Sequence, residues 1–205
     1  MRRIESPRFE DVDQIKPKIT QGERRVFELF RTCLAPEWEI YFNPHLNGLR
    51  PDFVLLNPRV GIAVYEIKDW ELRRDNVTRE GHHHLRRTDG QGRTWREPDP
   101  LDKVKHYREE ILSLYCPSLD RGKESIAVLT AGVIFTKTSG EVLASLYPSD
   151  RPQQLPVVGR ECLTARGVET IVPDLHRVGS MYMRPDLADE LRHWLFETAA
   201  RDGEH

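Results

Sequence analysis

The sequence predicts an α/β sandwich in which helices cover a central mixed sheet. Apolar residues recur with helical spacing in three segments that begin near residues 20, 99 and 185. Short runs of β-branched, aliphatic and aromatic residues lie between these segments and are typical of strands. In chain order the main elements are one helix, three strands, a second helix, further strand sequence and a last helix, which is the pattern of an α/β sandwich.

Length and composition are typical of a soluble globular protein with one sizeable core and an appendage. The chain has 205 residues, of which 31% are charged and 38% hydrophobic, and its mean hydropathy is -0.61. The longest apolar run, residues 126–135, is about half of what a membrane-spanning helix needs. We therefore expect no membrane partner. The net charge of -2 gives the whole molecule no electrostatic attraction to nucleic acid.

Cysteine usage and the first residues favour the cytoplasm. Three cysteines are widely spaced and form no Cys-x-x-Cys motif, which favours a reducing compartment and argues against zinc. Charged residues, and not an apolar stretch, follow the first five residues, so no secretory signal is indicated.

The first helix is expected after an irregular, proline-interrupted lead-in over residues 1–19. Thr20 fits an N-cap, and Glu23 fits the position from which a capping box reaches back to it. Apolar side chains then recur until Pro36 ends the helix. Glu23 also lies on this apolar stripe. Its carboxylate is therefore expected either to cap the helix or to face the sheet as an acidic site residue.

A strand over residues 38–42 and a hairpin are expected next. The hairpin strands, near residues 53–56 and 62–67, are separated by turn residues. Side chains alternate along a strand, so Glu66 and Lys68 share one face.

The predicted register brings two carboxylates together. A turn centred near residue 59 pairs Leu56 with Ile62 and Asp52 with Glu66. Directly opposed Cβ atoms lie roughly 4.5–5.5 Å apart, and like charges at that distance repel. Such a pair either shares a proton or holds a cation. Lys68 adds an ammonium group to the same face.

A polar, arginine-rich excursion is expected after Trp70, with one or two short exposed strands. Residues 71–97 contain seven arginines and five acidic residues, which predicts a local positive patch. Arg86 and Arg87 are its candidate nucleic-acid contacts. The consecutive histidines at 82–84 do not converge on one ion, so we interpret them as a solvated loop.

A second helix is expected from Asp99-Pro100 to Cys116-Pro117, with Lys103 and Tyr107 one turn apart on the same side. Beyond it we expect core strand sequence over 126–136, a short helix near 140–147, a strand at 157–158, a short element over 166–173 and an amphipathic helix over 185–200.

The acidic residues indicate a metal-dependent reaction. Buried charges cost several kcal/mol unless they are paired or bound to metal. A site built from Asp52, Glu66 and Glu23 offers oxygen ligands, which predict Mg²⁺ or Mn²⁺. Such an ion on a phosphate polarises phosphorus and activates water, while Lys68 stabilises the developing charge or helps to position the water. Phosphodiester hydrolysis is therefore the leading reaction class.

Two spaced motifs, Pro51-Asp52 and Glu66-Ile67-Lys68, resemble the signature of the PD-(D/E)XK nuclease superfamily. The wider string resembles its nuclease-related domain (NERD) branch over about residues 20–137. It runs from Gly22-Glu23 through Arg50-Pro51-Asp52-Phe53 and Val64-Tyr65-Glu66-Ile67-Lys68-Asp69-Trp70 to Asp99-Pro100-Leu101. This resemblance implies a restriction-endonuclease-like α/β/α sandwich.

The resemblance also implies roles for individual residues. Asp52, Glu66 and the carbonyl of Ile67 bind Mg²⁺ or Mn²⁺, Glu23 completes the site, and Lys68 is catalytic. Related nucleases support the site with a Gln-x-x-x-Tyr motif on a helix.

Here Lys103 and Tyr107 occupy the two motif positions. Lysine donates hydrogen bonds but cannot accept them, unlike glutamine. These two residues, with Arg50, are expected to support the site or contact nucleic acid. The family's domain often precedes a superfamily 1 helicase, so residues 138–205 are expected to pack on the core as a junction to such a region.

Three functions follow. The first is a metal-dependent nuclease acting on DNA. The second is a nucleic-acid-binding or helicase-accessory module that does not cleave, and it rests on the arginine-rich excursion and on Lys103. The third is a protein-interaction domain that uses the final helix.

Overall fold

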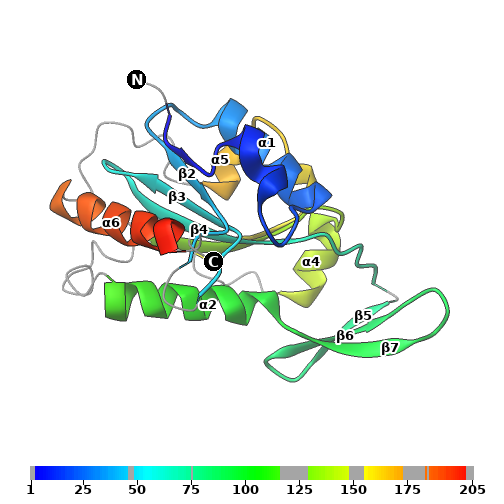
Figure 1. Ribbon diagram of the computed structural model, residues 1–205. Coiled ribbons are helices and arrows are strands. Elements are labelled where there is room, and N and C mark those ends of the chain that lie inside the picture. The colour runs from blue at the N-terminus through cyan, green and yellow to red at the C-terminus, as the bar shows by residue number, and fades with distance from the viewer. Residues whose placement is uncertain are drawn as a thin grey trace.

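A six-stranded mixed sheet forms the centre of the computed structural model (Figure 1). The structure describes residues 3–45, 49–74, 76–115, 129–147, 155–172, 183 and 185–201. The strands, in their order across the sheet, are β1 (Glu5–Ser6), β2 (Glu39–Phe42), β3 (Phe53–Asn57), β4 (Gly61–Lys68), β8 (Leu129–Phe135) and β9 (Val157–Val158). The two pairings of β3 are antiparallel and the other three pairings are parallel. The predicted α/β class with a mixed sheet is confirmed.

Helices cover both faces of this sheet. One face packs against α1 (Gln21–Cys33) and α5 (Val168–Ile171). The other packs against α2 (Pro100–Glu110), α4 (Gly140–Leu146) and α6 (Pro185–Arg201), and a π-helical turn, Ile111–Tyr115, continues α2. No helix among the described residues is both long and apolar enough to cross a membrane. The expected end of the second helix at Cys116-Pro117 and the first residues of the 126–136 strand lie outside the described residues.

Strand alternation explains why the core has two parts. Val64 on β4 belongs to the cluster under α2, whereas Tyr65 belongs to the cluster under α1. Leu56 pairs with Ile62, so the predicted hairpin register is confirmed. The ladder ends one step short of Asp52, at the pair Phe53 and Tyr65.

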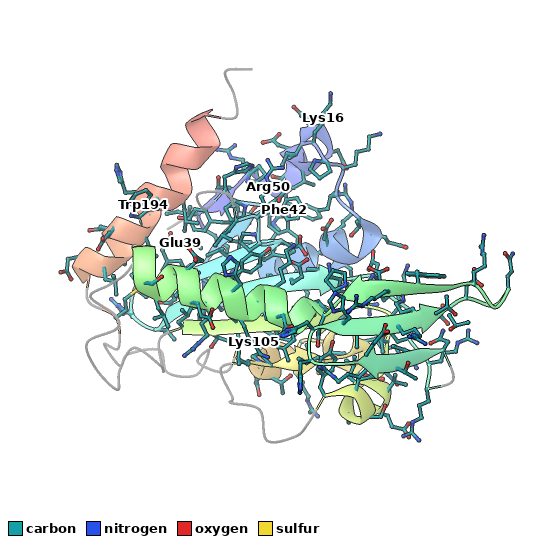
Figure 2. All side chains as sticks on the ribbon, turned by 90° about the horizontal axis from the view of Figure 1, so that it is seen from below. Lys16, Glu39, Phe42, Arg50, Lys105 and Trp194 are labelled. Atoms are coloured by element: carbon teal, nitrogen blue, oxygen red, sulfur yellow. The ribbon has the colours of Figure 1, made fainter. Side chains whose placement is uncertain are left out.

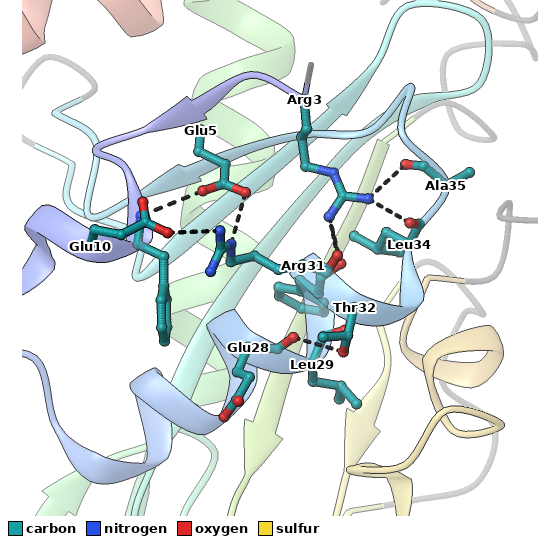
Figure 3. Close-up of polar contacts among 11 residues, drawn as sticks. Arg3, Glu5, Glu10, Glu28, Leu29, Arg31, Thr32, Leu34 and Ala35 are labelled. Atoms are coloured by element: carbon teal, nitrogen blue, oxygen red, sulfur yellow. Dashed lines mark hydrogen bonds and ion pairs between the residues drawn. The ribbon is translucent and has the colours of Figure 1, made fainter. Parts of the chain in front are cut away.

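The lead-in is more ordered than the sequence predicts. Residues 5–6 form β1 parallel to β2, and a 3₁₀ helix, η1 (Phe9–Gln14), follows. Figure 3 shows the contacts that hold this segment on α1: the Arg3 guanidinium donates to carbonyls at the end of the helix, and Arg31 lies 2.9 Å from the Glu5 carboxylate. A two-residue strand is too short to show a periodic pattern, and the contacts that fix it join residues far apart in the sequence, so it could not be predicted.

The arginine-rich excursion forms three strands, not one or two. These are β5 (Val77–Glu80), β6 (His84–Thr88) and β7 (Thr94–Pro98), which make a separate antiparallel sheet projecting from the body (Figure 1). The strands are hard to predict from the sequence because few of their side chains are apolar, so no alternation of apolar and polar residues marks them. Val77 and Leu85 are buried in the core cluster under α2 and attach the sheet to the body.

A buried carboxylate also attaches the small sheet. Asp99 precedes α2, and its side chain is only 1% exposed. It accepts hydrogen bonds from the Leu101 amide at 2.9 Å and the Tyr147 hydroxyl at 2.9 Å, and Arg79 on β5 lies 2.7 Å away. One side chain thus joins β5, the start of α2 and the end of α4.

Replacing Asp99 is therefore expected to destabilise the fold strongly. In Asp99→Ala, a buried tyrosine hydroxyl and an arginine lose their acceptor, so we expect the free energy of unfolding to fall by about 3–5 kcal/mol. The matched control is Asp102→Ala in the same helical turn, whose partners His83 and Lys105 are exposed. It should lose less than about 1 kcal/mol in urea denaturation. Equal losses in the two variants would contradict this role of Asp99.

Candidate active site

Two carboxylates lie side by side where the central hairpin opens. Glu66 is near the end of β4, and Asp52 stands directly before β3. The Glu66 side chain is only 2% exposed. The Asp52 Oδ2 atom accepts a hydrogen bond from the Ile67 amide at 2.6 Å, which holds Asp52 beside the strand that carries Glu66. The sheet register therefore brings the predicted acidic pair together.

Two lysines share one oxygen of Glu66. The Lys68 ammonium lies 2.7 Å from Glu66 Oε1 and the Lys103 ammonium lies 2.8 Å from the same atom. Lys68 comes from β4 itself, whereas Lys103 reaches over from α2. The expected sharing of a face by Glu66 and Lys68 is confirmed.

Tyr107 contacts the other oxygen of Glu66. Its hydroxyl lies 3.3 Å from Glu66 Oε2 and donates to the Arg50 carbonyl at 2.8 Å. Lys103 and Tyr107 are four residues apart on α2, so both reach the same carboxylate. Burial and the nearby carboxylates raise the pKa of Tyr107, which keeps its hydroxyl a hydrogen-bond donor.

Asp52 is less well compensated than Glu66, which has two ammonium groups on one of its oxygens. Burial, followed by the charge of Glu66, raises the pKa of Asp52 to about 7. The Ile67 amide and the Lys68 ammonium oppose this rise without cancelling it. At neutral pH a proton or a cation therefore stabilises Asp52.

Glu23 caps its own helix. Its Oε2 atom accepts from the Thr20 amide at 2.6 Å, and its amide donates to the Thr20 hydroxyl at 3.2 Å, so the predicted capping box is confirmed. Its charge still contributes to the raised pKa of Asp52. Across the described parts of the chain, no three His, Cys, Asp or Glu side chains are grouped to hold a metal. The expected third carboxylate is thus turned toward its own backbone.

The start of α1 is fixed to the sheet by Asp69, a contact that sequence patterns did not indicate. Asp69 Oδ2 accepts from the Gly22 amide at 3.0 Å, and Oδ1 accepts from the Thr136 hydroxyl. A Cβ atom at residue 22 would lie 1.7 Å from Asp69 Oδ1, so any other residue there would displace this carboxylate from its two hydrogen bonds. The one available signal was a glycine in the first turn of a helix, where it is otherwise unfavourable.

The three arginines of the predicted site do not form one surface patch. Arg50 is exposed and its side chain donates to His45, while its carbonyl faces Tyr107. Arg87 stacks between Trp70 and Trp95, with guanidinium-to-ring distances of 4.6 and 5.4 Å.

Arg86 lies on the opposite face of the small sheet from Arg87, because neighbours along β6 alternate. It lies 2.7 Å from Glu80. Every arginine between residues 77 and 98 has a carboxylate within 3.7 Å. The predicted positive patch is therefore largely neutralised within the sheet itself.

The oxygen atoms of the acidic pair fit a hard divalent cation. Asp52 and Glu66 Oε2 supply carboxylate oxygens, and the Ile67 carbonyl points to the same side as the Ile67 amide that meets Asp52. Glu66 Oε1, in contrast, is already covered by two ammonium groups. The arrangement suits a cation that binds next to the lysines and neutralises Asp52.

The raised pKa of Asp52 predicts a pH-dependent stability. The folded protein holds this proton more tightly than the unfolded chain, whose aspartates titrate near 3.8. The resulting stability is complete below that value and is lost as pH rises through about 7. In EDTA, the free energy of unfolding of Asp52→Asn should therefore rise relative to that of the wild type as pH increases from about 4 to about 8, by up to about 4 kcal/mol. Urea denaturation across this range checks it, and a pH-independent difference between the two proteins would contradict it.

Comparison with known proteins identifies the family. Residues 18–135 match the nuclease-related domain (NERD) family. This span contains the hairpin, α1, the small sheet and α2, and hence all the residues of the candidate site. No curated protein and no solved structure gave a match. Because the matched span covers more than half of the 205 residues, this chain belongs to the nuclease-related domain family.

Proposed function

We propose that the chain is a metal-dependent nuclease that hydrolyses phosphodiester bonds of DNA, with Mg²⁺ or Mn²⁺ as its cofactor. The observation that carries this proposal is the pair of Asp52 and Glu66 beside Lys68, with an Asp52 pKa raised to about 7. Membership of a nuclease-related family supports the general class.

Each residue of the candidate site has a separate role in the proposed hydrolysis. Asp52, Glu66 Oε2 and the carbonyl of Ile67 would hold the cation, which when bound polarises the phosphate and lowers the pKa of an attacking water. Lys68 places a positive charge where negative charge develops on the phosphate. Tyr107 orients Glu66 through the contact of its hydroxyl with Oε2. Glu23 acts at a distance, through its charge on Asp52.

Removing either charged group should abolish cleavage. Glu66→Ala and Lys68→Ala are expected to lower the rate of DNA cleavage by at least about 100-fold. Plasmid and linear DNA incubated with each protein and Mg²⁺ or Mn²⁺ give the measurement. Glu71→Ala is the control, because Glu71 is 61% exposed and pairs only with Arg73 among the described ion pairs. Products formed equally by wild type and both site variants would rule out the nuclease.

Lys103 favours a second candidate function, a nucleic-acid-binding or helicase-accessory module without cleavage. Its ammonium lies on the same Glu66 oxygen as that of Lys68, so two positive charges already occupy one side of the acidic pair. Both compete electrostatically with a divalent cation. In this function the lysines replace the metal as the charges that balance the acidic pair.

Lys103→Gln separates the two functions. Removing one ammonium should tighten Mn²⁺ binding by roughly 5- to 10-fold, equivalent to about 1 kcal/mol for a partly exposed pair. Isothermal titration with Mn²⁺ measures the affinity. Lys105→Gln is a matched control, because both lysine side chains are 47% exposed but Lys105 contacts Asp102 instead of Glu66. Binding by the wild type supports the nuclease, whereas binding by Lys103→Gln alone supports the non-cleaving module.

Two further assignments remain predictions. Residues 138–205 are proposed to lead to a superfamily 1 helicase region in the same or another chain, and the protein is proposed to act in the cytoplasm.

A protein-interaction role for α6 is tested by removing residues 185–205 and measuring whether a partner is lost while cleavage is unchanged.

A further inference from the structure

Trp95 on β7 presents an exposed aromatic ring that is held in one orientation. The residue is 38% exposed. Its indole Nε1 donates to Glu97 at 2.9 Å, and the Arg87 guanidinium lies 5.4 Å from the ring centroid. An exposed ring that is fixed in this way has little entropy to lose on binding, which is typical of a contact residue.

A continuous stack leads from this ring to the acidic pair. The Arg87 guanidinium also lies 4.6 Å from the centroid of the Trp70 ring, and the Lys68 ammonium lies 5.5 Å from the same centroid. Lys68 in turn binds Glu66 at 2.7 Å. Aromatic rings and positive charges therefore alternate from Glu66 to the edge of the small sheet.

The register of the small sheet turns this stack toward the body. Arg87 pairs with both Val77 and Trp95, so these three side chains share one face. Val77 is buried in the core cluster, which shows that this face is the inner one. On the outer face Arg86 and Arg96 both contact Glu80. The sheet thus directs its aromatic surface, and not a strongly positive one, toward the candidate site.

We propose that the exposed ring of Trp95 stacks on the bases of single-stranded nucleic acid and guides the strand toward Glu66 and Lys68. Arg87, which is paired with Glu97 at 3.2 Å, and the partly buried Trp70 hold this ring in position relative to the acidic pair. Flat base faces stack on aromatic rings when they are unpaired, whereas a duplex hides them between neighbouring base pairs. Duplex binding depends instead on extended positive surfaces, which the paired arginines of this sheet do not provide. This inference rests on the proposed action on nucleic acid and narrows its substrate to single strands.

Binding measured without cleavage tests the inference. The full chain in EDTA is titrated into labelled oligothymidylate, labelled oligouridylate and a labelled DNA duplex, and fluorescence anisotropy gives each affinity. Trp95→Leu should weaken single-strand binding by roughly 5- to 150-fold, the range for one lost base stack. Trp95→Phe keeps a stacking face and should lose less than half of that effect on a logarithmic scale. DNA and RNA arms show which single strand is preferred.

The control is Trp194→Leu. Trp194 is 39% exposed, so its exposure matches that of Trp95. It lies on α6, on the opposite side of the molecule from the projecting strands (Figure 2). Its replacement should leave single-strand affinity unchanged. Thermal unfolding of both leucine variants checks that each is folded at the temperature of the binding assay.

The outcomes separate this inference from the proposed function. Equal single-strand affinity of Trp95→Leu and Trp194→Leu, or wild-type preference for the duplex, would overturn the stacking inference even if Mg²⁺-dependent cleavage is found. A different result would support the inference and overturn the nuclease. In it, the wild type binds single strands but cleaves nothing with Mg²⁺ or Mn²⁺, and Trp95→Leu loses the single-strand binding.

Discussion

The close approach of Asp52 and Glu66 is the constraint on which the site depends. A central hairpin cannot place two carboxylates beside each other, one of them almost fully buried, without positive charge or protons nearby. Lys68, Lys103 and Tyr107 supply that compensation for Glu66. Asp52 accepts a hydrogen bond from one backbone amide, and burial, followed by the charge of Glu66, raises its pKa. Asp52 is therefore the member of the pair at which an added proton or cation would be most stabilising.

The rest of the fold holds this pair in place from both faces of the sheet. On one face, Asp69 ties the start of α1 to β8 next to the end of β4. On the other face, α2 delivers two side chains to Glu66, and Asp99 fixes the start of that helix. Because Asp99 also binds Arg79 on β5, the small sheet is attached to the same helix end that positions the site. Asp99 therefore holds in place both the small sheet and the helix that carries Lys103 and Tyr107.

Lysine at position 103 changes what the family fold can do in this chain. A glutamine side chain would orient the site without adding charge, whereas an ammonium on Glu66 lowers the demand for a metal. The proposed metal binding and the proposed single-strand stacking involve different residues, Lys103 in one case and Trp95 in the other. Single substitutions at these two positions therefore test the two proposals independently.

The sequence by itself determined the fold class, the hairpin register, the capping box of Thr20 and Glu23, and the nearness of Asp52 to Glu66, because each follows from local periodicity or from turn and cap chemistry. Tertiary structure decided the rest. It paired the arginines of the excursion with carboxylates and brought Lys103 onto Glu66. It also assembled Trp70, Arg87 and Trp95 into one stack. These contacts join segments whose spacing in the chain carries no periodic signal, so only the packing of α2 and the small sheet on the core fixes them.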